Sequence, residues 1–206
     1  MTCRYQKLIA STAKAPMRIV QAKVLANTLG QVEAFVDGLS TLGDKLGAIL
    51  WQFELKLGGD DFATFVDGLP GTANGVRLRH ALEVRDANKV DATLIDLARR
   101  KNAALVYTDS PEWPSLADVT ADFVYARPMQ AKSKETTGYP RAALKQWAAR
   151  ARTWSRGEEP DDLPKLCGPA TGAQHRDVFV FFINADKERN PAAAMTMIEL
   201  LEGASK

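Results

Sequence analysis

The sequence predicts an α/β domain in which parallel β-strands alternate with helices. Apolar runs of strand length alternate with amphipathic stretches of helical period along most of the chain. The strand-like runs are apolar throughout, as in strands that helices bury on both faces. The length of 206 residues suits one domain with a substantial core, and no repeat or low-complexity segment divides it.

Six segments are predicted to be strands. They share runs of β-branched, aromatic or other apolar residues that end at polar residues, Gly or Pro. In chain order these segments are 17–24, 48–53, 79–86, 104–110, 122–128 and 177–186.

Helical periodicity fills the intervals between these strands. In the segment 139–157, for example, Leu144, Trp147 and Trp154 fall on one stripe with basic residues around it. The segment 158–175 is polar and rich in Pro and Gly, and is predicted to be a long surface loop. The predicted helices lie within 28–47, 60–70, 89–103, 139–157 and 190–203.

Charge and cysteine content restrict the function classes. The net charge of +2 does not indicate a nucleic-acid partner, and only the basic face of 141–156 keeps that alternative open. Cys3 and Cys167 form no disulfide framework or zinc motif, which fits a reducing cytoplasm. No apolar run approaches the ~18 residues of a membrane span. We therefore expect a cytoplasmic protein without membrane contact.

Polar side chains follow five of the predicted strands where each strand ends. In parallel β/α folds the carboxyl ends of all strands lie at one rim, and ligand sites are built there. We therefore expect a polar pocket at this rim. Its ligand-binding candidates are Lys23, Gln52, Arg85, Arg127, Tyr139 and Asn184, and its catalytic candidates are Glu83 and Asp109.

The residue types at the rim predict an anion site. Arg85, Arg127 and Lys23 form the expected cationic cluster, because guanidinium groups bind phosphate or carboxylate bidentately. Glu83 or Asp109 would act as a general base if burial raises its pKa towards neutrality.

A structural interpretation of the same residues stays open. Glu83 with Arg127, or Arg85 with Asp109, would then be buried ion pairs that satisfy each other. Tyr139 and Trp113 lie in predicted loops near the rim, where they would either stack on a ligand or pack the loop.

No cofactor is expected. A zinc site needs several His ligands, whereas the chain has only His80, at the far end of its strand from the rim, and His175, in the long loop. The alternative left open is a Mg²⁺ held by Glu83, Asp109 and Asp186. The sequence contains no Ser–His–Asp context, dinucleotide fingerprint or P-loop.

Several motifs together resemble those of the YecE-like family, a bacterial and archaeal group of unknown function with a TIM-barrel fold. They cover nearly the whole chain in the family's order. The motifs are "LGDKLGAILWQF", "HALEVRD", "VYTDSPEWP", "ADVTADFVYARP", "GYPRAALKQWAARARTW" and "RDVFVFFINADKERNPAAAM".

The chain departs from the family at its start. Members begin with a strand that ends in a "GTSGW"-like motif and a second strand with a Glu–Asn stretch, and neither motif occurs here. The resemblance therefore implies a single domain over residues 1–206, a TIM-barrel-like fold of about six strands that correspond to units 3 to 8 of the barrel. An open sheet edge invites pairing. The alternatives are therefore a truncated or mis-started gene product, a partial barrel, or a homodimer that covers the open edge.

The resemblance carries no established activity. Similarity to phosphate-handling TIM barrels, which is an analogy of fold alone, implies a small anionic ligand, phosphorylated or sugar-like. It also implies a hydrolase of phosphoester or glycoside type. The alternative is a non-catalytic or decayed barrel with a binding or scaffold role only.

Overall fold

A parallel sheet of six strands forms the centre of the protein. The computed structural model describes residues 11–54, 58–170, 175–183 and 187–203. Neighbouring strands are parallel throughout, in the order β1-β2-β5-β6-β7-β8, and β3 and β4 form a separate antiparallel hairpin. The strands are β1 Ser11–Lys14, β2 Leu46–Phe53, β3 Thr72–Ala73, β4 Val76–Arg77, β5 His80–Val84, β6 Ala104–Thr108, β7 Phe123–Arg127 and β8 Asp177–Val180.

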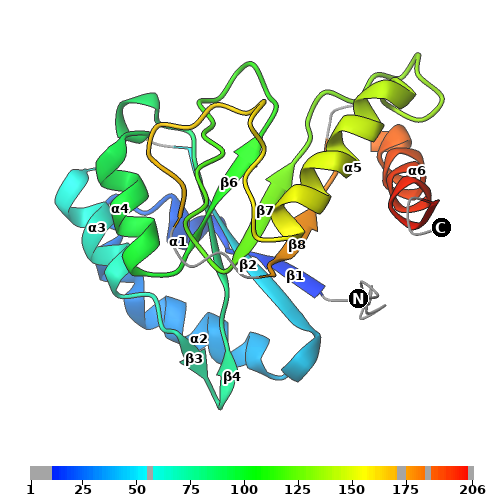
Figure 1. The fold of residues 1–206 in the computed structure, drawn as a ribbon. Helices are drawn as coiled ribbons and strands as arrows, with labels where there is room; N and C mark the ends of the chain where they lie inside the picture. The colour runs from blue at the N-terminus through cyan, green and yellow to red at the C-terminus, as the bar shows by residue number, and fades with distance from the viewer. Residues whose placement is uncertain (1–10, 55–57, 171–174, 184–186, 204–206) are drawn as a thin grey trace.

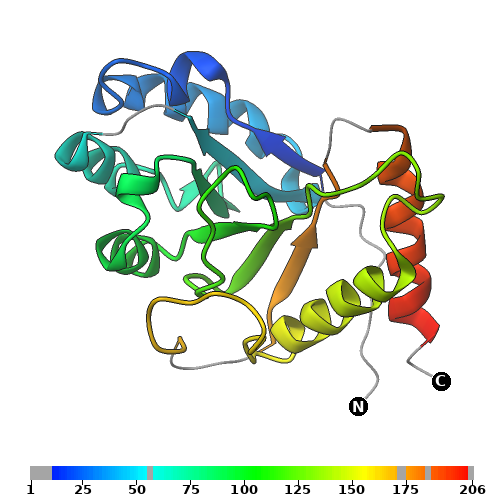
Figure 2. The ribbon, with the colours of Figure 1, turned by 90° about the horizontal axis from the view of Figure 1, so that it is seen from above.

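Helices cover the outer side of this sheet. The sheet curves into an open arc with the helices outside it, as the wall of a barrel does (Figures 1 and 2). This arrangement confirms the predicted α/β class and an incomplete TIM-barrel-like fold. No helix in the described part of the chain is long and apolar enough to cross a bilayer. The helices are α1 Met17–Val20, α2 Leu29–Ser40, α3 Gly59–Asp67, α4 Ala92–Arg100, α5 Arg141–Ser155 and α6 Asn190–Gly203, with short 3₁₀ turns at Ala26–Thr28, Gly43–Lys45, Ala87–Lys89 and Lys187–Arg189.

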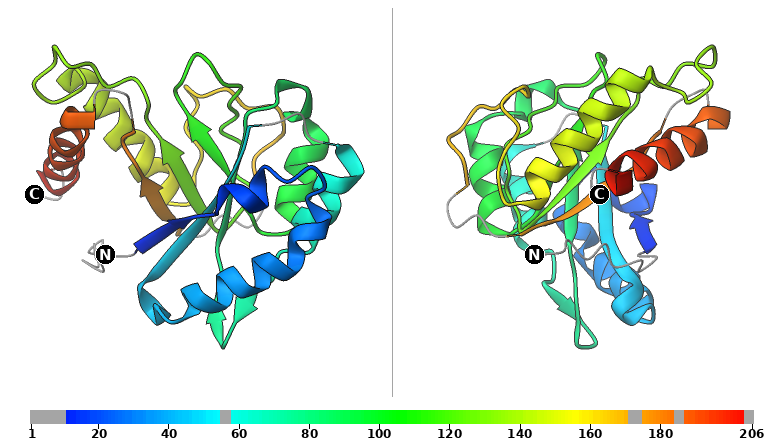
Figure 3. Two further views of the ribbon diagram at one scale, coloured as in Figure 1. Left: turned by 180° about the vertical axis from the view of Figure 1, so that it is seen from behind. Right: turned by 45° about the vertical axis from the view of Figure 1, so that its right-hand side comes forward.

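Aromatic side chains join the sheet to its helices. Phe53 of β2 meets Phe62 of α3 edge to face, with 5.1 Å between the ring centroids. On the other half of the sheet, Tyr107 of β6 contacts Trp147 and Trp154 of α5 at 5.9 and 6.3 Å. Helix α6 packs beside α5 (Figure 3). The helical stripe predicted within 139–157 is thus confirmed.

The inner face of the arc carries small side chains on one half and rings on the other. Tyr125 of β7 stacks on Phe179 and Phe181, with centroid distances of 6.2 and 5.1 Å. The side chains of Tyr125 and Thr12 hydrogen-bond, which joins β7 to β1 across the arc. The first strand of the sheet therefore contacts its second-last strand across the inner face of the arc. The homodimer alternative stays a prediction.

The predicted strand over 17–24 is wrong. The structure places the one-turn helix α1 in this segment, and the first strand, β1, precedes it. Ile19 and Val20 are buried in the outer core, so tertiary packing overrides the strand preference of these β-branched residues. Strand β1 has only four residues and no large apolar side chain, so periodicity alone gives it little signal.

The other predicted elements are present with adjusted ends. Strands β2, β5, β6, β7 and β8 and helices α2 to α6 all lie within or across the predicted segments. The last predicted strand is shorter than expected, since β8 ends at Val180 and residues 184–186 lie outside the described ranges.

His80 at the start of β5 is part of the core and lies far from the rim, as predicted. Trp51 Nε1 donates to its Nδ1 at 2.9 Å, and its Nε2 lies 2.8 Å from the Pro70 carbonyl oxygen. Because Nδ1 accepts, Nε2 must carry the proton and donate to Pro70. Burial lowers the pKa of His80 from 6.5 to about 4, so the ring is neutral at pH 7.

The predicted long loop contains no helix or strand over its described part, 158–170, and is nevertheless anchored. The buried carboxylate of Asp118, in the β6–β7 connection, accepts the N–H groups of Leu166 and Cys167 at 2.9 and 2.7 Å. The N–H of Ala117 donates to the Pro164 carbonyl at 2.8 Å. The loop is therefore fixed against the amino-terminal side of β7.

Candidate functional site

Three of the predicted site residues meet on the inner face at the carboxyl ends of the strands. Gln52 of β2 and Glu83 of β5 are register partners, and Arg127 is the last residue of β7. They are 5%, 3% and 6% exposed, so the site is nearly closed to water. Strands β2 and β5 are neighbours, and only β6 separates β5 from β7, which explains how residues so distant in sequence converge.

Glu83 is held by two guanidinium groups. Arg127 Nη1 donates to Glu83 Oε2 and, at 3.1 Å, to Gln52 Oε1. Arg85 Nε donates to Glu83 Oε1 at 2.8 Å. Each carboxylate oxygen of Glu83 therefore accepts a hydrogen bond from an arginine. We call Gln52, Glu54, Glu83, Arg85 and Arg127 the rim cluster.

Arg85 connects this cluster to the surface. Its Nη1 pairs with Glu54 Oε1 at 3.0 Å, and its guanidinium carbon lies 4.4 Å from the ring centroid of Trp113. Trp113 thus stacks on an arginine, which holds the guanidinium plane in place. Glu54, which also accepts from Gln52 Nε2, was missed by the sequence analysis. Its position two residues after Gln52, at the end of the same strand, is the signal that could have found it.

One donor of the rim cluster has no partner. Arg127 Nε is buried, and no hydrogen-bond acceptor lies within reach of it in the described structure. An unsatisfied buried donor costs about 1–3 kcal/mol, and more when the group is charged. A ligand oxygen at this strand end would supply the missing hydrogen-bond acceptor of Arg127 Nε.

Asp109 and Tyr139 form a second polar group beside the chain that leaves β7. Asp109 Oδ1 accepts the Met129 N–H at 2.6 Å, and the Tyr139 hydroxyl accepts the Gln130 N–H at 2.6 Å. The Asp109 and Tyr139 side chains also hydrogen-bond to each other. Burial raises the pKa of the Asp109 carboxyl and that of the Tyr139 hydroxyl.

The ion pairs differ in part from the predicted alternatives. The pair Glu83–Arg127 is present, whereas Arg85 pairs with Glu83 and Glu54. No Arg85–Asp109 pair occurs among the described residues. Arg85 directly follows β5, and Glu54 directly follows the neighbouring strand β2. Asp109 follows β6, and its carboxylate accepts a backbone N–H after β7.

The remaining candidates are Lys23, Asn184 and Asp186. Lys23 is exposed in the loop after α1 and is not on a strand, so the reason for placing it at the rim was wrong. Asn184 and Asp186 lie outside the described residues. Within the described ranges no group of three or more His, Cys, Asp or Glu side chains is arranged to hold a metal ion.

A curved parallel sheet with outer helices and a buried charged cluster at its strand ends defines a TIM-barrel-like β/α protein. The family described as protein of unknown function DUF72 matches residues 9–206. The chain belongs to this family. Since DUF72 is the YecE family, the resemblance seen in the sequence is confirmed.

A solved structure of a DUF72 family protein from Thermotoga maritima has a similar fold. The similarity covers 96% of this chain and 74% of that one, with a TM-score of 0.65 and 17% sequence identity. At this identity the likeness shows the fold alone. No match was found among curated proteins. That the first two strand units are missing stays a prediction.

Proposed function

We propose that the rim cluster binds a small anionic ligand, phosphorylated or sugar-like, through Arg85 and Arg127. The observation that carries this proposal is the buried Arg127 Nε without an acceptor. The other contacts of this guanidinium, to Glu83 and Gln52, fix its orientation. An anion oxygen supplies the missing acceptor at the end of the barrel where ligands of such folds bind.

The ligand would compete with Glu54 for Arg85. Glu54 is 41% exposed on its side chain and holds Arg85 by one contact at 3.0 Å. Exposed ion pairs contribute about 0–1 kcal/mol, so an anion can displace this carboxylate at little cost. Glu83 and Trp113 would keep the Arg85 guanidinium in place while the anion replaces Glu54 as its partner.

A hydrolytic step would use Asp109 in preference to Glu83. Both oxygens of Glu83 are engaged by arginines, which suits a positioning role. Burial raises the pKa of Asp109 in the direction that general acid–base catalysis requires, and Tyr139 orients its carboxyl. We therefore propose a hydrolase of phosphoester or glycoside type.

The second candidate function is a scaffold without catalysis. The observation that favours it is the direct pairing of the charges: Glu83 pairs with two arginines and Arg85 with two carboxylates. Networks of this kind also occur as purely structural features. The two proposals differ in whether an anion binds.

Titration calorimetry with inorganic phosphate separates them. We expect saturable binding to the unmodified protein and binding weakened roughly tenfold or more in Arg85→Gln, because a charge-assisted contact is lost. The matched control is Arg156→Gln, which also removes an arginine paired with a glutamate, here the exposed Glu158 at 3.3 Å.

The control should bind phosphate as the unmodified protein does. Absence of saturable binding in all three proteins, or an equal loss in both variants, would favour the scaffold.

A further inference from the structure

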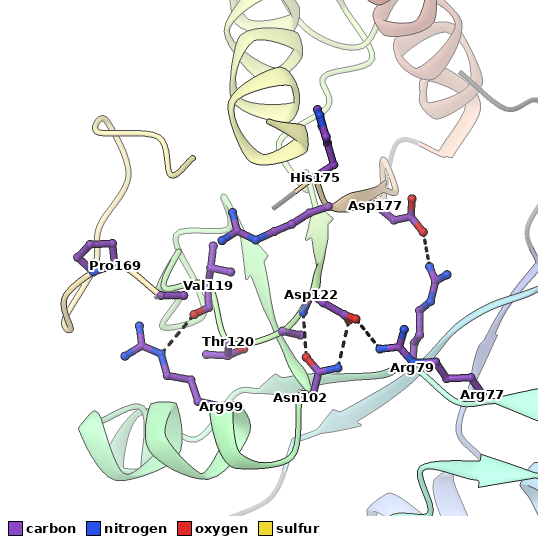
Figure 4. Close-up of a pocket in the computed structure, with 13 residues that line it drawn as sticks. Arg77, Arg79, Arg99, Asn102, Val119, Thr120, Asp122, Pro169, His175 and Asp177 are labelled. Carbon is purple, nitrogen blue, oxygen red and sulfur yellow. Dashed lines mark hydrogen bonds and ion pairs between the residues drawn. The ribbon is translucent and has the colours of Figure 1, made fainter. Parts of the chain in front are cut away.

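A cavity lies at the amino-terminal end of the strands, opposite the rim cluster (Figure 4). Its volume is about 680 Å³, within the range of small-molecule sites. Residues at or just before the starts of β5, β6, β7 and β8 line it together with β4, α4 and the long loop. Four arginines are among them: Arg77, Arg79, Arg99 and Arg176.

Carboxylates neutralise two of these four arginines. Arg77 pairs with Asp122, and Arg79 pairs with Asp177 at 2.7 Å. Asp122 is also fixed by Asn102, which donates to its Oδ1 at 3.1 Å and accepts its N–H at 2.9 Å. Both ion pairs are thus held at the wall of the cavity, and neither leaves an acidic side chain free to repel an anion.

Arg99 has neutral partners instead. Its Nε donates to the Val119 carbonyl at 3.3 Å, and its Nη2 donates to the Gly168 carbonyl at 2.7 Å. No carboxylate within the described residues forms an ion pair with it. Arg99 therefore joins α4 to the long loop and brings an uncompensated positive charge to the cavity.

Arg176 is the most buried of the four, with 8% of its surface exposed. Its Nη1 donates to the Glu158 carbonyl at 3.2 Å, and burial lowers its pKa while the charge of Glu159 acts in the opposite direction. Glu159 Oε1 accepts the Ala170 N–H at 3.0 Å. Its buried Oε2 lies 3.9 Å from Lys165 and has no hydrogen-bond partner among the described residues. A buried guanidinium in this setting is stabilised by additional negative charge.

The rest of the wall is partly apolar. Val119, Ala121, Pro169 and Ala170 line the same cavity. The loop side of the cavity is held by Arg99 and by the Asp118 contacts described above. An anionic group with an attached apolar portion fits this combination of surfaces.

We propose that this cavity binds an organic phosphate, whose phosphoryl oxygens contact Arg99 and Arg176 and whose apolar portion lies against Val119, Ala121 and Pro169. The site is separate from the rim cluster, which is at the other end of the same strands. Guanidinium groups match phosphate oxygens in geometry and charge.

The test is a calorimetric titration with inorganic pyrophosphate at low salt. It is done in an Arg85→Gln background, in which the rim has lost its more exposed arginine. We expect one saturable site that Arg99→Gln weakens roughly tenfold or more. The matched control is Arg100→Gln, the next residue of α4, whose Nη2 lies 3.7 Å from Asp67, outside the cavity lining.

Arg77→Gln is the second test variant. Its side chain is 56% exposed, so its loss should leave the fold intact, as far-ultraviolet circular dichroism would verify. It frees the charge of Asp122 beside the cavity and should therefore weaken pyrophosphate binding, roughly threefold or more. The proposal is overturned by absence of saturable binding, by unchanged affinity in both test variants, or by an equal loss in Arg100→Gln.

Discussion

Replacing Arg127 by methionine should lower the free energy of unfolding by about 3–5 kcal/mol and abolish phosphate binding at the rim. Arg127 and Glu83 have side chains only 7% and 3% exposed, so removing one charge leaves the other buried. Arg85 still contacts Glu83 at 2.8 Å, which places the loss at the lower end of this range. Urea unfolding of both proteins measures the difference.

The control is the double variant Arg127→Met with Glu83→Gln. It removes both buried charges, and the glutamine keeps an oxygen for Arg85 and an amide that can donate to Gln52. We expect it to recover more than half of the stability lost by Arg127→Met, without recovering phosphate binding. A loss below about 1 kcal/mol in the single variant would contradict a buried, mutually dependent pair.

Lowering the pH from about 6.5 to 4 should remove about 3 kcal/mol of stability through His80 alone. The folded protein holds the pKa of His80 at about 4, below its ordinary value of 6.5, because the ring is buried. Between these two values the unfolded chain binds the proton and the folded protein does not. The contribution of the neutral His80 ring to the free energy of unfolding is therefore complete above pH 6.5, and it is lost progressively as the pH falls towards 4.

His80→Gln isolates this effect. A glutamine can accept from Trp51 and donate to the Pro70 carbonyl, as the neutral ring does, but it does not titrate. We expect the free energy of unfolding of the unmodified protein, relative to that of His80→Gln, to fall by about 3 kcal/mol between pH 7 and pH 4 in urea unfolding. Parallel pH profiles would show that His80 is not held neutral by the fold.

Much of the rim could be predicted from the sequence because one rule governs it. Gln52, Glu83 and Arg127 end apolar strands, and parallel strands end at one side of the sheet. The stripe of Leu144 and Trp147 likewise follows from helical period alone. In both cases the pattern recurs along the sequence, either within one helix or at the ends of successive strands. It can therefore be recognised without knowing which elements contact each other.

The features that could not be predicted from the sequence depend on contacts between elements. Helix α1 exists because Ile19 and Val20 are buried, and neither residue type signals it. Arg85 pairs with Glu83 and with Glu54, which follows the neighbouring strand, and not with Asp109. The amino-terminal cavity draws Arg99 and Arg176 from a helix and a loop far apart in the chain, so no spacing could reveal it.

A structure determined with inorganic phosphate at saturating concentration tests the central claim most directly. We expect an ordered phosphate within hydrogen-bond distance of Arg127 Nε and of Arg85, with the contact between Arg85 and Glu54 broken. An unaltered pair between Arg85 and Glu54, with no phosphate at the ends of β5 and β7, would contradict it.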